Sequence, residues 1–413
     1  MREDERDQAA PPAGESGLHG EGDQEHDQAA PPAGESGLHG EGDQEHDQAA
    51  PPAGESGLHG EGEEGAGAGR SGASKPPGPD GEGEEGAGAA WSERPPAPAV
   101  LRSSLIEFEL RAEQEASLPR YVGSTLRGAI GVALRERSCV TGAPTCDRCP
   151  HWQTCHYGRV WESPPQPEGP RRFADPPRAY VLDPFHYGAR SRFLPGDRLA
   201  FRLRVFGPAI DRVPWIILAI RDAALSGLGR GRARFRLIRA SAFDDQREPL
   251  LLYANDRMAE TARLGVQELR PVRTRELSEP GRVTLQLETP LHLTDQGATS
   301  RAVDPVVFST RLLDRFDALL HFYEDATSGI DRMHIRRIAG LARVVHHDLI
   351  PDAFRRHSQR AGRVPMEGLL GRVTFDHVVP ELFGLWKLGE VLHVGKQTTF
   401  GFGKVRVLVE HVI

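Results

Sequence analysis

Two segments of this chain repeat one order of elements: an apolar helix, a glycine-rich basic turn and a strand of alternating hydrophobicity. They span residues 215–237 and 382–407. The first closes a β-α-β-β-α-β pattern, and the second half of the chain follows the same plan. Two such units in tandem are typical of ferredoxin-like (RRM-like) domains, whose sheet face is a familiar RNA-binding surface. The sequence therefore predicts an α+β protein with two tandem ferredoxin-like domains.

The periodicity of apolar residues places the individual elements. In the first half it predicts strands at 106–110, 180–182, 199–205 and 235–237, with helices at 121–137 and 215–225. In the second half it predicts strands at 283–287, 373–375 and 405–409, helices at 312–323 and 381–390, and a mostly helical basic region at 329–362. The predicted domains are a tail at 1–98, an N-terminal domain at 99–245 with a cysteine-rich insertion at 138–170, a linker at 246–280, and a C-terminal domain at 281–413.

The tail differs in chemistry from the rest of the chain. It holds 23 acidic and 5 basic residues, whereas the remainder holds 36 acidic and 46 basic ones. A 20-residue unit, DQAAPPAGESGLHGEGDQEH, starts at Asp7 and Asp27 and begins again at Asp47. Its one large apolar residue is a leucine, so the repeats bury too little surface to offset chain entropy. We predict a disordered acidic tail, which is either an inert expansion or a decoy that screens the basic body.

The positive charge of the body favours a polyanionic partner. Its cations are almost all arginines, which fits either RNA binding or a bias of genome composition. The acidic N-terminus lacks the apolar core of a secretory signal, and the longest strongly apolar run, at 215–220, is far too short to cross a membrane. We expect a soluble, cytoplasmic protein without a membrane partner.

The sharpest motif is the glycine-rich segment at 395–404, GKQTTFGFGK, which leads directly into the last strand. Nucleotide cradles of the GxGxxG and GxxxxGK[ST] types need a strand before the loop and a helix after it, and here that order is reversed. Glycines permit the close approach of a ligand, while lysine and threonine side chains donate to phosphate oxygens. We predict that this segment binds an extended RNA strand through Gly395, Lys396, Thr398, Thr399, Gly401, Gly403 and Lys404.

All four cysteines lie within seventeen residues, at Cys139, Cys146, Cys149 and Cys155. Disulfides are disfavoured in a cytoplasmic protein, and the Cys-x-x-Cys step lets two sulfurs reach one zinc ion. We predict structural zinc; an iron–sulfur cluster and unligated thiols are the alternatives, and His151 or His156 can replace a sulfur. Such a metal would fold a small knob that has no core of its own, and no catalytic metal is expected.

Several motifs resemble the RAMP superfamily of CRISPR-associated proteins. Residues 121–131, YVGSTLRGAIG, are similar to the superfamily's first-helix motif, and residues 395–403 look like its C-terminal glycine-rich loop. The four-cysteine insertion after the first helix, together with HVGK at 393–396, resembles one branch more closely, the endoribonucleases that process precursor CRISPR RNA. The resemblance covers residues 100–413 and none of the tail.

The resemblance implies an endoribonuclease that cuts precursor CRISPR RNA within its repeats, without a metal, to give mature guide RNAs. The ribose 2′-OH would attack the neighbouring phosphate and leave a 2′,3′-cyclic phosphate and a 5′-OH. Such a reaction uses a base near neutral pKa, usually histidine, and cations over the phosphate. Arg127 on the first helix would bind RNA phosphate, or alternatively pair with a glutamate. The implied partners are CRISPR repeat RNA and other subunits of a CRISPR effector complex.

The sequence departs from the family pattern at the expected histidine, because residues 118–138 contain none. The candidates elsewhere are His346, His347 and His393, and we predict His347 and His393 as the catalytic residues. For each, the alternative is a solvated or hydrogen-bonded structural histidine. Tyr121 is either a proton donor or a packing residue.

Two further functions fit the same motifs. A non-catalytic RAMP subunit would hold guide RNA with the same loop and basic surface, but it needs no histidine near the phosphate. A zinc-dependent nucleic-acid module would lose RNA binding itself when zinc is removed. The missing first-helix histidine favours the non-catalytic subunit, whereas the cysteine insertion and the HVGK loop favour the endoribonuclease.

Overall fold

The computed structural model describes residues 99–410, except for 167–175, 186–187, 189, 245, 261, 273 and 359–361. The predicted acidic tail lies outside the described residues. Ala89–Ile413 form one compact unit, to which all described residues belong. Within the described part of the chain, no helix has the length and apolar character needed to cross a membrane.

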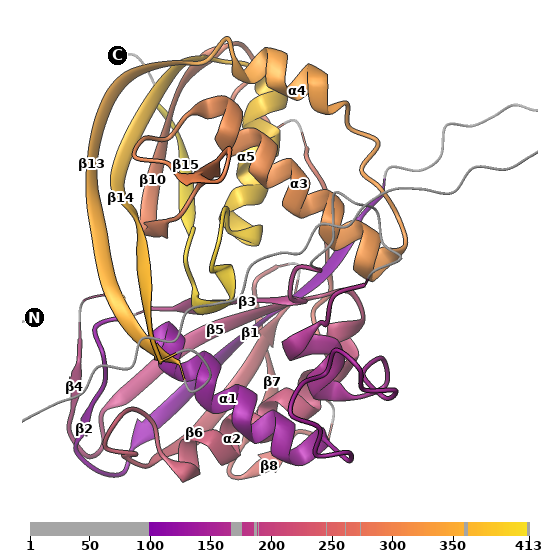
Figure 1. The fold of residues 1–413 in the computed structure, drawn as a ribbon, viewed down its shortest axis with the longest axis vertical. Helices are drawn as coiled ribbons and strands as arrows, with labels where there is room; N and C mark the ends of the chain where they lie inside the picture. Colours follow the sequence, from indigo (N-terminus) through magenta and orange to yellow (C-terminus); the bar gives the residue numbers. More distant parts are fainter. Residues whose placement is uncertain are drawn as a thin grey trace, which may run out of the picture. The chain divides into compact units, whose positions relative to one another are not determined.

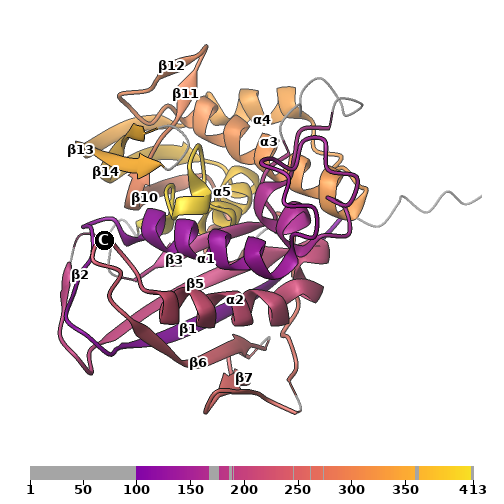
Figure 2. The same ribbon diagram turned by 60° about the horizontal axis from the view of Figure 1, so that its bottom comes forward.

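The N-terminal domain is built on a sheet whose central neighbours run in the order β3-β5-β1-β6. These strands are β1 (Leu101–Ala112), β3 (Tyr180–Pro184), β5 (Arg198–Phe206) and β6 (Phe235–Phe243). Helix α1 (Val122–Ser138) follows β1, helix α2 (Val213–Ser226) follows β5, and the two helices lie side by side (Figure 2). This strand order is that of a ferredoxin-like domain and agrees with the prediction for this half.

The C-terminal domain repeats this order in a four-stranded antiparallel sheet, β13-β14-β10-β15. Its strands are β10 (Gly281–Leu291), β13 (Arg343–Ser358), β14 (Gly362–Val378) and β15 (Val405–Glu410), and its long helices are α3 (Pro305–Glu324) and α5 (Pro380–Leu392). Helix α3 starts where the sequence favours it, because the Asp304 side chain accepts hydrogen bonds from two backbone N–H groups of the first turn and Pro305 presets the helical φ.

The shorter elements complete the chain. They are β2 (Ala116–Ser117), η1 (Tyr157–Glu162), β4 (Arg192–Phe193), η3 (Gly207–Arg212), β11 (Thr294–Asp295), β12 (Ala298–Thr299) and α4 (Arg332–Ala339).

The structure corrects the expectation that 329–362 is mostly helical. Among the described residues of this region, only the short α4 is helical, and β13 then pairs with β14 from Arg343 opposite Asp376 to Ser358 opposite Gly362. The sequence Val344-Val345 favours strand because branched Cβ atoms lose rotamer freedom in a helix. The described arginines of this basic region are divided between the two elements: Arg332, Arg336 and Arg337 lie on α4, and Arg343, Arg355 and Arg356 lie on the edge strand β13.

The predicted linker at 246–280 is also corrected, because it extends the N-terminal sheet. It contains β7 (Pro249–Ala254), β8 (Arg257–Met258) and β9 (Gln267–Leu269). Strand β7 pairs with β6, and β9 pairs with β1. The burial of Leu252 and Tyr253 against this sheet explains why the segment is ordered as strand.

The two domains contact each other at several points. Arg102 pairs with Glu324 at 3.1 Å, and the hydroxyls of Ser163 and Tyr323 lie 3.2 Å apart. The β13–β14 hairpin arches away from its own sheet and reaches helix α1 of the N-terminal domain (Figure 1). This hairpin brings strands of the second domain to the first-helix motif.

Candidate functional site

The glycine-rich loop between α5 and β15 is folded tightly against its own protein. It contains one short 3-10 turn, η4 (Thr398–Phe400). A Cβ at Gly395 would lie 2.3 Å from the carbonyl oxygen of His292, and one at Gly403 would lie 1.9 Å from that of Val394. Both glycines also have positive φ. They are therefore required by the loop's approach to neighbouring backbone, rather than by a ligand alone.

The predicted RNA-binding residues of the loop differ in their exposure. Lys396 is exposed, Gly395, Thr399 and Lys404 are partly exposed, and Thr398, Gly401 and Gly403 are buried. Lys404 forms ion pairs with Asp183 of β3 at 3.0 Å and with Glu288 of β10 at 3.3 Å. Lys404 thus joins the two domains, and Lys396 is the predicted loop cation whose side chain lies in solvent.

The loop contacts the start of helix α1. A Cβ at Gly123 would lie 1.9 Å from the carbonyl oxygen of Phe400, so this glycine lets the loop reach the first helical turn. The ring of Tyr121 packs against Phe402 and against Phe354 of β13, with centroid distances of 4.8 and 4.9 Å. Helix, loop and hairpin therefore meet at one place, which we call the junction: Tyr121, Gly123, Phe354, Phe400 and Phe402.

Cations from different elements surround the junction. The Cζ atom of Arg127 on α1 lies 5.4 Å from the ring centroid of Phe400, and that of Arg356 on β13 lies 4.7 Å from the same centroid. The exposed Arg120, just before α1, pairs with Asp352 at 3.6 Å. Burial lowers the pKa of Arg356, and the charge of Arg127 lowers it further. The junction is a positively charged place at a helix N-terminus, which favours phosphate.

His393 lies beneath the loop and is only 3% exposed. Its Nδ1 lies 3.0 Å from the carbonyl oxygen of Phe402, which can only accept, so Nδ1 carries the proton. Burial lowers the pKa of His393 to about 4, opposed by Asp183 and reinforced by Lys404 and Arg315. The ring is therefore uncharged at neutral pH. This geometry favours the structural alternative for His393.

His347 lies on the edge strand β13, exposed and opposite Val373 of β14. Arg356 lies nine positions further along the same strand, or about 30 Å of extended chain. Its neighbour His346 is exposed as well. The structure thus keeps the two predicted catalytic histidines apart: His347 lies in solvent on the edge strand, while His393 is buried under the loop.

His292 is a histidine that the sequence analysis missed. It directly follows β10, and its carbonyl oxygen accepts a hydrogen bond from the Lys396 N–H at 2.9 Å. Its ring is half-buried, and among the described residues its Nδ1 has no hydrogen-bond partner. No local motif marks this residue, because its place beside the glycine-rich loop arises from the pairing of distant segments.

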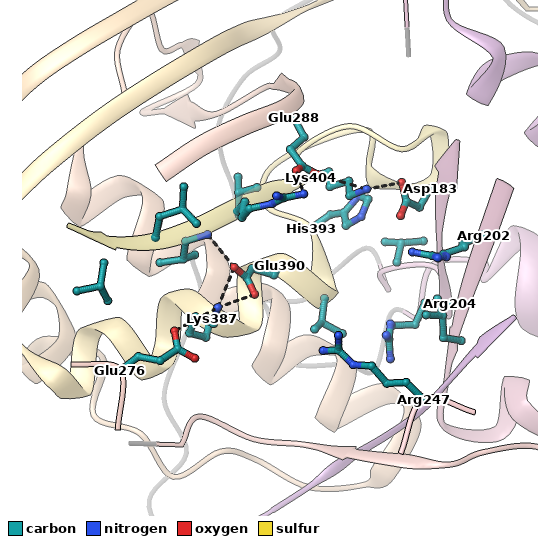
Figure 3. Close-up of a pocket in the computed structure, with 18 of the residues that line it drawn as sticks. Asp183, Arg202, Arg204, Arg247, Glu276, Glu288, Lys387, Glu390, His393 and Lys404 are labelled. Carbon is teal, nitrogen blue, oxygen red and sulfur yellow. Dashed lines mark hydrogen bonds and ion pairs between the residues drawn. The ribbon is translucent and has the colours of Figure 1, made fainter. Parts of the chain in front are cut away.

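A cavity of about 740 Å³ opens between the two domains, next to the loop. The cations that line it are Arg202, Arg204, Arg247, Arg275, Lys387, Lys404 and Arg406, and the carboxylates are Asp183, Glu276, Glu288 and Glu390. Figure 3 shows Lys404 between Asp183 and Glu288, with Arg202, Arg204 and Arg247 along another part of the wall. Burial lowers the pKa of Arg204 to about 10, although the group remains charged at neutral pH. Cations outnumber carboxylates here, so the cavity suits an anionic ligand.

The four cysteines line one small pocket in the insertion, together with His151. The Thr141 hydroxyl lies 3.8 Å from the sulfurs of both Cys139 and Cys149. Burial, Glu162 and the neighbouring thiols raise the pKa of Cys146 to about 11. Among the described residues, no three His, Cys, Asp or Glu side chains are grouped closely enough to hold a metal ion. The structure therefore gathers the predicted ligands without supporting the predicted zinc site.

Residues 285–405 match a family model described as CRISPR-associated endoribonuclease Cas6. The C-terminal domain is thus similar to the Cas6 endoribonuclease family. A second model, described as an N-terminal domain, matches residues 101–264. The match to the Cas6 model confirms the resemblance to CRISPR-associated endoribonucleases that process precursor CRISPR RNA, and it covers the segment from within β10 to the start of β15.

Solved structures of Cas6 proteins are similar over most of this chain at low identity. A Cas6 product complex is 18% identical, with a TM-score of 0.41, over 76% of this chain and 100% of that one. Thermus thermophilus Cas6 is 16% identical, with a TM-score of 0.43, over the same shares. A Cas6-RT-Cas1–Cas2 complex is 12% identical, with a TM-score of 0.46, over 76% of this chain and 30% of that one. A comparison with curated proteins found no match.

Proposed function

We propose that this protein cleaves precursor CRISPR RNA within its repeats and releases mature guide RNAs. The observation that carries the proposal is the direct contact between the first-helix motif and the glycine-rich loop, with Gly123 against the Phe400 carbonyl. Two motifs that lie about 270 residues apart in the chain thereby meet at the positively charged junction. The Cas6 domain supplies the class of reaction.

The reaction proposed for this place is attack of a ribose 2′-oxygen on the adjacent phosphorus. The 2′-OH loses its proton to a base, the new P–O bond forms, and the 5′-oxygen leaves and takes up a proton. The products are a 2′,3′-cyclic phosphate and a 5′-OH. Arg127 and Lys396 would stabilise the charge that develops on the phosphate oxygens. This internal nucleophile needs no metal-bound water.

We assign the proton transfer to His292 ahead of the two predicted histidines. His292 directly follows β10, and its backbone carbonyl accepts a hydrogen bond from the Lys396 N–H at the start of the loop. Histidine is the side chain best suited to exchange protons near neutral pH. His393 instead donates its Nδ1 proton to backbone, and His347 lies far along β13. Both remain testable alternatives.

A non-catalytic subunit that holds guide RNA is the second candidate function, and one observation favours it. His347 is exposed on β13, whereas His393 is buried and hydrogen-bonded to backbone. Such a subunit would bind repeat RNA through the same junction and leave it intact.

The deciding experiment incubates the purified protein with radiolabelled repeat RNA in EDTA and analyses the ends of the product. A 2′,3′-cyclic phosphate that disappears when the ribose at the cut site is 2′-deoxy supports the enzyme. Bound RNA that stays intact for hours with the unmodified ribose supports the binding subunit instead.

We keep a structural metal in the cysteine-rich insertion as a proposal. What supports it is that all four thiols and His151 line one pocket. The test is elemental analysis of the purified protein, followed by thermal unfolding and RNA binding with and without chelator. Loss of stability with RNA binding retained at low temperature supports a structural ion, and loss of binding alone supports a zinc-dependent nucleic-acid module.

A further inference from the structure

The ring of Phe400 stands within reach of two guanidinium groups that come from different domains. Arg127 belongs to α1 of the N-terminal domain, with its Cζ 5.4 Å from the ring centroid. Arg356 belongs to β13 of the C-terminal domain, with its Cζ 4.7 Å away. Phe400 itself lies in the glycine-rich loop. An aromatic face attracts each cation, so the ring holds two like charges near one another.

Arg127 and Arg356 differ from those partly buried arginines that pair with a carboxylate. Arg137 pairs with Asp222, and Arg202 pairs with Glu107 at 2.9 Å. Among the described residues, no carboxylate forms an ion pair with Arg127 or Arg356.

The polar atoms around the two arginines leave their charges uncompensated. The Nε atoms of Arg127 and Arg356 are buried, and neither has a hydrogen-bond partner within the part of the chain that the structure describes. The buried hydroxyl of Tyr180 lies within the influence of Arg127, but burial raises its pKa, so it supplies no negative charge. Two cations held together without an anion are unfavourable unless a ligand provides one.

We propose that Arg127 and Arg356 form a clamp for one phosphodiester group of a single-stranded RNA, with Phe400 setting the separation of the two guanidinium groups. The identity of the anion as RNA rests on the proposed function. Two guanidinium groups can each donate to a phosphate oxygen, and a phosphodiester is the anion that such paired forks match. The clamp supplies cations at the place where the family pattern would have a first-helix histidine.

The β13–β14 hairpin brings a residue of the C-terminal domain, Arg356, next to Arg127 of the N-terminal domain. Side chains alternate along β13, so Phe354 and Arg356 share the face that packs on the junction, and Arg355 points to the opposite, exposed face. Contact of Phe354 with Tyr121 therefore positions Arg356 over Phe400. Phe354 is a positioning residue for the clamp and does not itself meet the phosphate.

The alternation supplies a matched control for a binding experiment. Arg127→Ala and Arg356→Ala each remove one cation of the clamp, while Arg355→Ala removes the same charge from the same strand on its other face. The probe is fluorescent oligouridine, whose binding is measured by anisotropy over a series of KCl concentrations. We expect each clamp variant to bind roughly tenfold more weakly and to lower the slope of log K against log salt by about 0.7. Arg355→Ala should change both quantities far less.

Two further measurements separate the possible failures. Thermal unfolding should show that Arg127→Ala and Arg356→Ala fold as stably as the wild type, because each relieves a like-charge contact. Cleavage of repeat RNA tests the proposed function separately: oligouridine binding that depends on both arginines without cleavage leaves the clamp standing and removes the enzyme. Equal losses for Arg355→Ala and Arg356→Ala, or wild-type binding that is indifferent to both clamp residues, overturn the clamp.

Discussion

Replacing Gly123 by alanine should displace the glycine-rich loop from helix α1. The new Cβ would lie 1.9 Å from the Phe400 carbonyl oxygen, whereas ordinary contact begins at about 3.4 Å, so helix and loop must separate by about 1.5 Å. The neighbour is backbone, which has no rotamer to change. Overpacking of this kind costs about 1–3 kcal/mol. A displacement of about 1 Å at a reacting site lowers the rate by about a hundredfold.

Gly128→Ala in the same helix is the matched control, because a Cβ there meets nothing within 4 Å. Gly128 is exposed, and alanine in an exposed helix interior stabilises by about 0.5–1 kcal/mol relative to glycine. The two alanine variants should therefore shift the unfolding temperature in opposite directions, and only Gly123→Ala should impair cleavage of repeat RNA. If both variants melt above the wild type and cleave equally well, the loop does not depend on its contact with α1, and the account of the junction is wrong.

Three other substitutions test separate parts of the site. His393→Asn should weaken the dependence of the free energy of unfolding on pH below 6.5. Burial holds the His393 pKa near 4 against an ordinary 6.5, so the wild type is fully stable above pH 6.5 and loses up to about 3 kcal/mol as the pH drops to 4. Urea unfolding that loses the same stability with pH in wild type and variant would contradict this. In single-turnover assays, His292→Ala should slow cleavage of repeat RNA by about a hundredfold or more, whereas His347→Ala should leave the rate nearly unchanged. The opposite ranking would identify His347 as the general base. Thr289→Val should lower the free energy of unfolding by about 1–3 kcal/mol. The buried Thr289 hydroxyl donates to the Gly401 carbonyl at 2.7 Å and accepts from the Lys404 N–H at 2.9 Å. An unchanged midpoint of urea unfolding would refute that role.

The elements that the sequence predicts well are those whose apolar pattern is local. The helix predicted at 312–323 falls within α3, and the strand predicted at 283–287 falls within β10. Both could be predicted because each buries one face against its own domain, which sets the period of its apolar residues. The β13 region was predicted to be helical because residues 343–348 are all exposed on an edge strand, so its first half shows no alternation of buried and exposed side chains. Its identity as strand depends on β14, which follows only after the hairpin turn.

The site was predictable in its motifs but not in its contacts. Residues 395–404 were found from glycines and cations in the sequence, and residues 121–131 from their resemblance to a family's first-helix motif. Their meeting through Gly123 and Phe400 is a tertiary contact that no local spacing encodes. Arg356 was hidden for the same reason, because only the reach of the β13–β14 hairpin brings it to the other domain. His393, by contrast, was close to the loop in sequence, but its burial could not be read from that position.

The central claim is that RNA phosphate lies at the junction of α1, the glycine-rich loop and the hairpin. Repeat RNA that carries a single 4-thiouridine at the cut site can be cross-linked to the protein with light, and the attached peptides identified by mass spectrometry. We expect the RNA to be cross-linked to peptides within 120–127, 354–356 or 395–404. Adducts confined to the exposed face of β13 around His347, or to the cysteine-rich insertion, would place the RNA elsewhere and contradict it.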